Sequence, residues 1–220
     1  MVLGALALIV TAALVAVSFS AREQGLDPAA LQGLDGIPAR YADIPASGVV
    51  LGDPDAPVSI TEFGDVACPA CKTAAESTVP DLIESQVRTG LATISFSPMA
   101  FIHPLTSERG ALAVIAAGRQ DMAWPMIEAI YANQGGESED WLSEEVLAAI
   151  AAGAGLDVAT WQADFASDEV ARDYAAAIQA ANAGGVSQTP TFIVEGPDGR
   201  EVVSGVSSAA QIAEAVRAVS

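Results

Sequence analysis

The chain has 220 residues, enough for one domain with a full hydrophobic core. Hydrophobic residues make up 51% of the sequence, which excludes intrinsic disorder over most of its length. There are 28 acidic residues against nine basic ones, for a formal net charge of −19. Because such a field repels phosphate backbones, we expect no nucleic-acid partner.

Residues 2–20 form an apolar run without a charged side chain, VLGALALIVTAALVAVSFS. A helix that rises about 1.5 Å per residue would nearly cross a hydrocarbon core of about 30 Å over this length. We therefore expect residues 1–21 to be a transmembrane anchor that holds the chain in the membrane through residues 2–20. A cleaved signal peptide is the alternative, because Ser18-Phe19-Ser20 resembles a small-x-small cleavage site.

The next segment, residues 22–48, contains several glycines and prolines and is expected to be a linker. Residues 49–220 then form the folded domain. Its first elements are a short edge strand at Val49–Leu51, a strand at residues 58–63 and a helix at residues 68–89, which Gly90 ends.

A second strand at residues 91–96 precedes an alanine-rich block with helical spacing. Helices are expected at residues 106–119, 124–133, 143–152, 158–166 and 168–182. Asp198-Gly199 predicts a hairpin turn between strands at residues 191–194 and 201–203, and a last helix covers residues 208–219. Without the helical block, this order of elements is that of a small α/β sandwich. The block, approximately residues 105–183, is therefore interpreted as an insertion.

The two cysteines lie in the motif Cys68-Pro69-Ala70-Cys71, at the predicted junction of strand and helix. At a helix N-terminus, free N–H groups and the helix dipole stabilise a thiolate, which is the species that attacks disulfides. Cys71 lies one turn further on the same face, where it can attack a mixed disulfide and release the substrate. Zinc is disfavoured because the chain has one histidine and no second cysteine pair, and we expect no metal or cofactor.

Glu62 is a second candidate site residue. Along the predicted strand it shares one face with Val58 and Ile60, so an acid lies on an apolar face six residues before Cys68. Burial there would raise the pKa of the carboxyl group. The group is then suited to exchange a proton with Cys71, unless it is an exposed glutamate at the end of the strand.

Thr189-Pro190 is the third candidate feature, directly before a predicted strand. An X-Pro bond at this place is where a cis peptide can occur. We expect a cis bond here, with the backbone of Thr189 facing Cys68 and free to pair with an extended substrate chain.

Together these features resemble the DsbA-like branch of the thioredoxin superfamily. The resemblance covers residues 49–219 approximately, with GDPDAPVSITEF before CPAC and GVSQTPTFIV after the helical block. It implies a thioredoxin fold of class α/β with an inserted helical subdomain. It also implies roles for five residues: Cys68 as nucleophile, Cys71 as resolving cysteine, Glu62 as buried acid, Pro190 as cis-proline and Thr189 before it.

The resemblance further implies a dithiol oxidase of exported proteins, recycled by a membrane redox partner. Ala70 departs from the pattern, because the best-known oxidases of the family have histidine there, so the oxidising power is expected to be lower. A disulfide reductase or isomerase of the same fold is the close alternative. A non-catalytic module that binds peptides or a metal at the CxxC motif is the alternative from another class.

The chemistry also decides the expected location. An oxidase needs an oxidising compartment, so we expect a single-pass membrane protein with an extracytoplasmic catalytic domain, or a secreted protein after signal cleavage. The positive-inside rule favours the opposite orientation, because Arg22 follows the apolar run and no basic residue precedes it.

Overall fold

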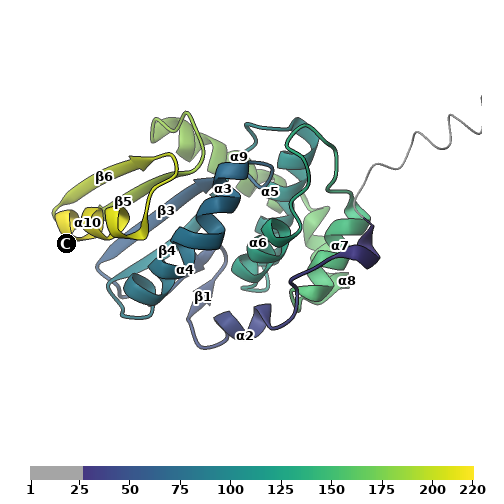
Figure 1. The fold of residues 1–220 in the computed structure, drawn as a ribbon, viewed down its shortest axis with the longest axis horizontal. Coiled ribbons are helices and arrows are strands. Elements are labelled where there is room, and N and C mark those ends of the chain that lie inside the picture. Colours follow the sequence, from purple (N-terminus) through teal and green to yellow (C-terminus); the bar gives the residue numbers. More distant parts are fainter. Residues whose placement is uncertain (1–26) are drawn as a thin grey trace, which may run out of the picture.

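The computed structural model describes residues 27–220, which form a six-stranded mixed sheet with helices on both faces (Figure 1). The expected membrane segment, residues 2–20, lies outside this range. Among the helices of residues 27–220, none is both long enough and apolar enough to cross a bilayer.

The sheet has the strand order β1-β2-β4-β3-β5-β6. Strand β3 runs parallel to β4, with Val58 opposite Ala92, and antiparallel to β5, with Glu62 opposite Phe192. The strands are β1 (Ala46–Ser47), β2 (Val50–Leu51), β3 (Val58–Gly64), β4 (Ala92–Pro98), β5 (Thr191–Gly196) and β6 (Gly199–Ser204). The short strand predicted at Val49–Leu51 forms as β2, but β1 pairs outside it, so β2 is not the edge strand.

The helical stretch that follows β3 runs without a break from Pro69 to Val87. It consists of α3 (Pro69–Thr73), the π-helical segment η2 (Ala74–Thr78), α4 (Val79–Leu82) and the π-helical segment η3 (Ile83–Val87). The sequence predicted a regular helix here. Pro80 lies between the two π segments, and because proline has no N–H to donate to the preceding turn, it disturbs the regular hydrogen-bond pattern.

A block of five helices follows β4. It consists of α5 (Pro104–Gly118), α6 (Ala123–Ala132), α7 (Glu144–Gly153), α8 (Val158–Phe165) and α9 (Asp168–Ala183), and the chain ends with α10 (Ala209–Val219). Ser143, Asp157 and Ser167 cap α7, α8 and α9 by accepting a backbone N–H in the first turn. The expected helix positions are therefore confirmed to within a few residues.

Helices cover the two faces of the sheet differently. The helical stretch from α3 to η3 packs on the face of the sheet that carries Ile60, and α10 packs on the same face. Leu82 of α4 and Ile212 of α10 are buried in one core with Ile60. Helix α9 covers part of the opposite face, where Ala181 packs with Phe63 and Ile193. Figure 1 shows α5 to α8 beside the sheet, as a helical subdomain attached through β4 and α9.

Residues 27–48, which we expected to belong to a linker, form short elements that pack on this helical subdomain and add β1 to the sheet. They contain a 3-10 turn, η1 (Pro28–Ala30), the short helix α2 (Ile37–Tyr41) and β1. Ile37 is completely buried. The backbone of Gln32 exchanges two hydrogen bonds with the Asn133 side chain, of 2.8 and 3.0 Å. Glycines and prolines here break the segment into short elements, which have no periodicity that a sequence pattern can show.

Candidate active site

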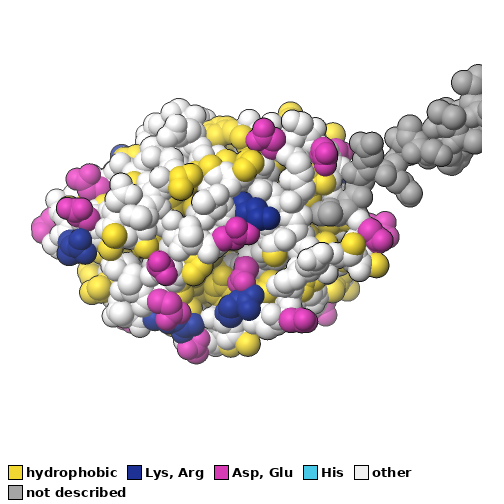
Figure 2. Space-filling view, viewed as in Figure 1, with side chains coloured by type: hydrophobic (Ala, Val, Ile, Leu, Met, Phe, Trp, Pro, Cys, Tyr) yellow, Lys and Arg dark blue, Asp and Glu magenta, His cyan; other side chains and the backbone are white. Residues whose placement is uncertain are grey.

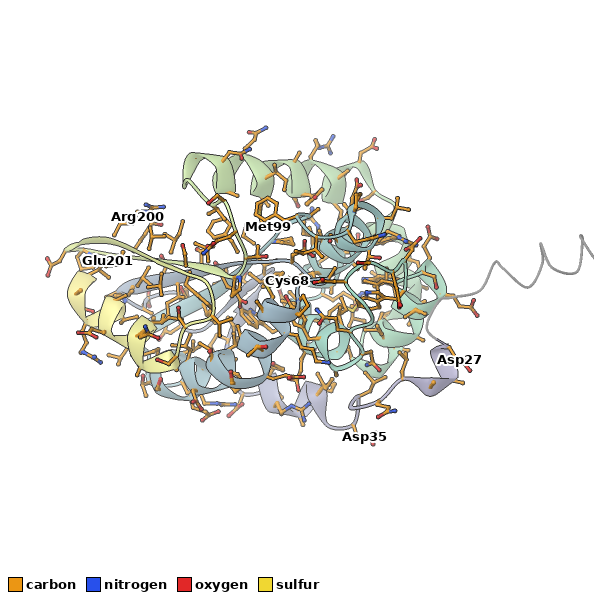
Figure 3. The ribbon with its side chains drawn as sticks, turned by 45° about the horizontal axis from the view of Figure 1, so that its top comes forward. Asp27, Asp35, Cys68, Met99, Arg200 and Glu201 are labelled. Carbon is orange, nitrogen blue, oxygen red and sulfur yellow. The ribbon has the colours of Figure 1, made fainter. Side chains whose placement is uncertain are left out.

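Cys68 directly precedes α3 and has extended backbone angles (φ −82°, ψ 119°), while Cys71 lies one turn further along the helix. Both residues are free thiols. The predicted position at the helix N-terminus is confirmed, but the Cys68 side chain is only 5% exposed, and Cys71 is completely buried. Figure 3 places Cys68 near the middle of the molecule, where the sheet meets the helical subdomain.

The two thiols have strongly different acidities. The pKa of Cys68 falls to about 6, chiefly because the Cys71 thiol donates a hydrogen bond to its thiolate, and this outweighs the opposing effect of burial. The Thr189 side chain and the N–H groups of Cys71 and Ala70 contribute further. The same hydrogen bond and burial raise the pKa of Cys71 above its ordinary value. The pKa of Cys68 is thus lowered mainly by the Cys71 thiol, and the N–H groups of the helix N-terminus contribute less than we expected from the sequence.

The segment before β5 closes the site from the other side. The Thr189–Pro190 peptide bond is cis, and the Cys68 Sγ lies 3.6 Å from the Thr189 carbonyl oxygen, to which its S–H donates. The expected cis bond and the expected position of the Thr189 backbone facing Cys68 are therefore both confirmed. The Thr189 backbone therefore lies directly beside the Cys68 sulfur.

Glu62 lies on β3 with 1% of its surface exposed. Val58 and Ile60 on the same face are buried as well, as the period of two predicted. Burial raises the pKa of Glu62 to about 8, and its Oε1 atom has no hydrogen-bond partner. The negative form of Glu62 also contributes to the raised pKa of Cys71. A buried acid that titrates near neutral pH is therefore electrostatically coupled to the resolving thiol.

Asp65 is a site residue that the sequence reasoning missed. Its side chain is completely buried, and its backbone N–H points to the Cys71 Sγ at 3.5 Å. Its backbone carbonyl accepts hydrogen bonds from the Cys68 N–H and from the hydroxyl of Tyr131, which lies on α6. The only sequence signal is an acid three residues before the motif, in a turn where acids are common.

The helical subdomain holds the Cys68 turn by two further contacts. The Gln134 amide, just after α6, donates to the Val66 carbonyl at 2.7 Å and to the Cys68 carbonyl at 3.1 Å. The Val66 side chain packs against Gly110 of α5, where a Cβ atom would collide with it. No motif in the sequence points to these residues, because their partners come from another part of the chain.

Two polar residues near the motif have other partners. Lys72 forms an ion pair of 3.7 Å with Glu76 and is not among the causes of the lowered Cys68 pKa. His103 caps α5, where its Nδ1 atom accepts the Thr106 N–H. Within residues 27–220, no three His, Cys, Asp or Glu side chains are grouped as a metal site would require.

In a comparison with known protein families, residues 46–216 match the family model described as thioredoxin. The chain belongs to the thioredoxin family. The match begins at β1 and ends in α10, so it includes the sheet, the Cys68–Cys71 motif and the helical subdomain.

Curated relatives of this thioredoxin-family chain include two Bacillus proteins. One is "Probable disulfide bond formation protein D" from Bacillus cereus, 38% identical over 102 residues, which are 46% of this chain and 47% of the relative. The other is "Disulfide bond formation protein D" from Bacillus subtilis, 31% identical over 104 residues, 46% of each chain. The chain thus matches about half the length of each relative.

Solved structures also resemble this member of the thioredoxin family. Oxidised BdbD from Bacillus subtilis has a TM-score of 0.69 and 22% identity, over 80% of this chain and 97% of that structure. A thioredoxin-like oxidoreductase from Silicibacter pomeroyi has a TM-score of 0.63 and 25% identity, over 83% and 95% of the chains. The DsbA of Chlamydia trachomatis, with a TM-score of 0.60 and 21% identity, shares the fold as well.

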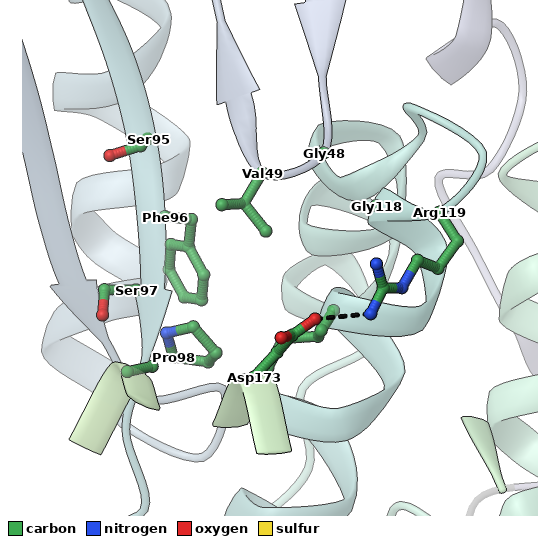
Figure 4. Close-up of a pocket in the computed structure, with 11 residues that line it drawn as sticks. Gly48, Val49, Ser95, Phe96, Ser97, Pro98, Gly118, Arg119 and Asp173 are labelled. Atoms are coloured by element: carbon green, nitrogen blue, oxygen red, sulfur yellow. Dashed lines mark hydrogen bonds and ion pairs between the residues drawn. The ribbon is translucent and has the colours of Figure 1, made fainter. Parts of the chain in front are cut away.

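Several cavities among the described residues are not lined by either cysteine. One, of about 310 Å³, lies between β4, α5 and α9, and the ion pair of Arg119 with Asp173 borders it (Figure 4). None of the predicted site residues lines it. At the redox site, Cys68 is in contact with Thr189 and only 5% exposed.

Proposed function

We propose that this chain is a thiol–disulfide oxidoreductase that acts outside the cytoplasm and transfers the Cys68–Cys71 disulfide to exported proteins. The observation that carries the proposal is the geometry of the cysteine pair, with Cys68 directly before α3, Cys71 one turn further and the Thr189 carbonyl 3.6 Å from the Cys68 sulfur. These surroundings lower the pKa of Cys68. A stabilised thiolate favours the dithiol form, which makes the corresponding disulfide a stronger oxidant. The names of the curated relatives, disulfide bond formation proteins, support the same direction of electron flow.

The reaction proceeds by two thiol–disulfide exchanges. A substrate thiolate attacks the Cys68 sulfur, the Cys68–Cys71 bond breaks, and Cys71 leaves and takes up a proton. A second substrate thiolate then attacks the substrate sulfur of the mixed disulfide, and Cys68 leaves as a thiolate. Two electrons pass from the substrate to the cysteine pair. The acidic Cys68 is a good leaving group for the second step.

Glu62 is the proposed proton donor to Cys71 in the first step and the acceptor in the reverse direction. Its pKa of about 8 keeps it mostly protonated at neutral pH, and its coupling to Cys71 connects the two groups. Thr189 and Pro190 are the proposed substrate-binding residues, because the Thr189 backbone lies beside the attacked sulfur.

The proposed location and partners follow from the chemistry. Every turnover leaves a dithiol, so a membrane redox partner must accept its electrons and restore the disulfide. An oxidising compartment is required for this cycle, and residues 2–20 would hold the domain at the membrane that contains the partner.

The reduction potential of the Cys68–Cys71 couple, measured in glutathione buffers, tests the proposal. We expect a value above that of thioredoxin, about −270 mV, and below that of the strongest oxidase, about −120 mV, because Ala70 replaces histidine. A value at or below the thioredoxin potential would favour the reductase. Replacement of Ala70 by histidine, Ala70→His, should raise the potential.

A double serine variant separates an enzyme from a binding module. With Cys68→Ser and Cys71→Ser, the transfer of disulfides to a reduced unfolded protein should stop. If the variant retained the full biological effect of the chain, a module that only binds peptides would explain the function better.

A further inference from the structure

Cys71 is the leaving group in the first exchange of the proposed reaction, and its side chain is completely buried. A negative sulfur that forms in such a place costs free energy unless hydrogen-bond donors stabilise it, because burial removes it from water. Glu62 is the proposed source of a proton, but the electron pair of the broken S–S bond stays on the Cys71 sulfur until that proton arrives. A donor that already points to this sulfur would therefore help the bond to break.

The backbone N–H of Asp65 is such a donor. It lies in the turn between β3 and Cys68, and it points to the Cys71 Sγ at 3.5 Å. Among the hydrogen bonds of residues 27–220, it is the only one that a backbone N–H donates to this sulfur. The hydrogen bond to Cys68 and burial raise the pKa of Cys71, and the Asp65 N–H opposes both effects. Such a contact becomes stronger when the thiol turns into a thiolate, because charge-assisted hydrogen bonds are the stronger ones.

The peptide unit that carries this N–H is also hydrogen-bonded at its other end. The carbonyl of the same peptide unit belongs to Gly64, and it accepts the N–H of Met99 at 2.8 Å. Hydrogen bonds at the two ends of one peptide unit polarise it and strengthen each other. The Met99 N–H, the peptide unit and the Cys71 sulfur thus form a continuous chain of hydrogen bonds, which makes the Asp65 N–H a better donor.

Contacts from three parts of the chain hold Asp65 in this orientation. Its carbonyl accepts the Cys68 N–H at 2.9 Å and the Tyr131 hydroxyl at 3.2 Å. Tyr131 is 1% exposed and belongs to α6, so the helical subdomain takes part in fixing the direction of the Asp65 N–H. The Asp65 carboxylate accepts three more backbone N–H groups at 2.7–2.9 Å, those of Ala67, Phe101 and Ile102.

We propose that the Asp65 N–H is a catalytic group that stabilises the Cys71 thiolate as it leaves, and that Tyr131 is a positioning residue that holds this N–H in place. The proposal rests on the proposed function and concerns one of its steps. When a substrate thiolate attacks Cys68, the Cys68–Cys71 bond breaks and its electron pair passes to the Cys71 sulfur. The Asp65 N–H acts there as the donors of an oxyanion hole act on a developing oxyanion, and Glu62 then supplies the proton. In the second exchange Cys68 leaves instead, so the Asp65 N–H acts in the first exchange alone.

The chemical shift of the Asp65 amide proton tests the contact directly. In Cys68→Ala, Cys71 is the only thiol of the chain, so the ultraviolet absorbance of the thiolate follows its titration. We expect the Asp65 amide proton to move downfield with the same pH midpoint as this absorbance. The control combines Cys68→Ala with Cys71→Ala, and it should lack the change although Glu62 still titrates in it. An amide proton that does not move in Cys68→Ala, or a change of equal size in the control, would overturn the proposal.

The kinetic test separates the two exchanges. Tyr131→Phe removes the hydroxyl and nothing else. The reaction of the Cys68–Cys71 disulfide with reduced glutathione, in which Cys71 leaves, should become about fivefold slower. In Cys71→Ser, a mixed disulfide of Cys68 with glutathione is attacked by a second glutathione, and Cys68 leaves. Adding Tyr131→Phe should change this rate less than about twofold, because the Asp65 N–H does not contact the Cys68 sulfur.

Tyr41→Phe is the matched control, because the Tyr41 hydroxyl bonds to Glu128 of α6 and not to the redox turn. It should leave both rates unchanged. An equal slowing of both exchanges in Tyr131→Phe would show a general structural role, and an unchanged first exchange would show no role, so either result overturns the assignment of Tyr131. If Tyr131→Phe does not fold, the amide shift in Cys68→Ala decides. A wild-type disulfide that is not transferred to a reduced unfolded protein contradicts the proposed function instead, and the amide shift does not depend on that result.

Discussion

Single residues far apart in the sequence control the reactivity of Cys68. Cys71 donates the strongest hydrogen bond to its thiolate. In the thiol form, the Cys68 S–H donates to the Thr189 carbonyl, 121 residues away in the chain. Gln134 fixes the Cys68 carbonyl from the helical subdomain. The motif of four residues therefore contains both the reacting atoms and the main cause of the lowered pKa, the Cys71 thiol, whereas Thr189 and Gln134 come from distant parts of the chain.

The first prediction concerns the two thiols. In the reduced chain, iodoacetamide should label Cys68 with a half-maximal rate at a pH of about 6, and Cys71 should stay unlabelled. Cys71→Ala should move the Cys68 midpoint upward, toward the ordinary thiol value, because it removes the main stabilising hydrogen bond. Mass spectrometry of the labelled peptides provides the measurement. An unchanged midpoint in Cys71→Ala would assign the effect to the N–H groups of the helix N-terminus.

The second prediction concerns Glu62 and the pH dependence of stability. Its pKa is about 8 in the folded chain and 4.5 in an ordinary environment, so the folded state binds the proton more tightly than the unfolded state. The associated stability is fully present below pH 4.5 and is lost as the pH rises through 8, by roughly 5 kcal/mol in all.

Glu62→Gln should lack this decline. Urea unfolding of both proteins in their disulfide forms, at several pH values from 4 to 9, measures the difference without thiol titration. Parallel pH curves for the two proteins would show that Glu62 does not have the raised pKa.

At the scale of elements, the strand–turn–helix unit of β3 and α3 depends on its contact with α5. Val66 of the turn packs into the space above Gly110, where any larger residue would collide with it. The sequence predicted helices α3 and α5 because capping residues and apolar spacing are local signals. It gave no indication of this contact or of the Asp65 hydrogen bonds, because both join segments that are distant in the chain. The same limit applies to the π segments around Pro80, where a regular helix was predicted.

The third prediction follows from that contact. Gly110→Ala should lower the free energy of unfolding by about 1–3 kcal/mol, because the new methyl group overlaps with Val66. Adding Val66→Ala should recover part of this loss, since it removes the overlapping atoms. Urea denaturation of the two single variants and the double variant measures the coupling. Fully additive losses would show that the two residues do not meet.

At the scale of the whole molecule, residues 27–48 are part of the folded unit and hold the helical subdomain from outside. Arg40 of α2 forms an ion pair with Glu128 of α6, and Leu34 packs against Gly153 of α7. The large negative charge is spread over the visible face and is not gathered over one element (Figure 2), as a solvated surface would require. The α/β sandwich and the helical insertion were predictable from element order, while this docked segment was not.

The fourth prediction concerns the docked segment. Ile37→Ala should destabilise the domain by about 2–5 kcal/mol, because Ile37 is completely buried. Val202→Ala, at a residue 46% exposed on β6, is the control and should change the stability little. A similar small effect for both variants, measured by thermal unfolding, would mean that the segment is not part of the cooperative unit.

The hydrogen bond between Cys68 and Thr189 has a consequence for the order of events during folding. The two residues are 121 positions apart, so their contact closes one of the longest loops in the chain. Until that loop closes, Cys68 lacks its contact with Thr189 and is not enclosed from that side. The redox site is therefore complete only when the segment before β5 has reached Cys68 and β5 has paired with β3.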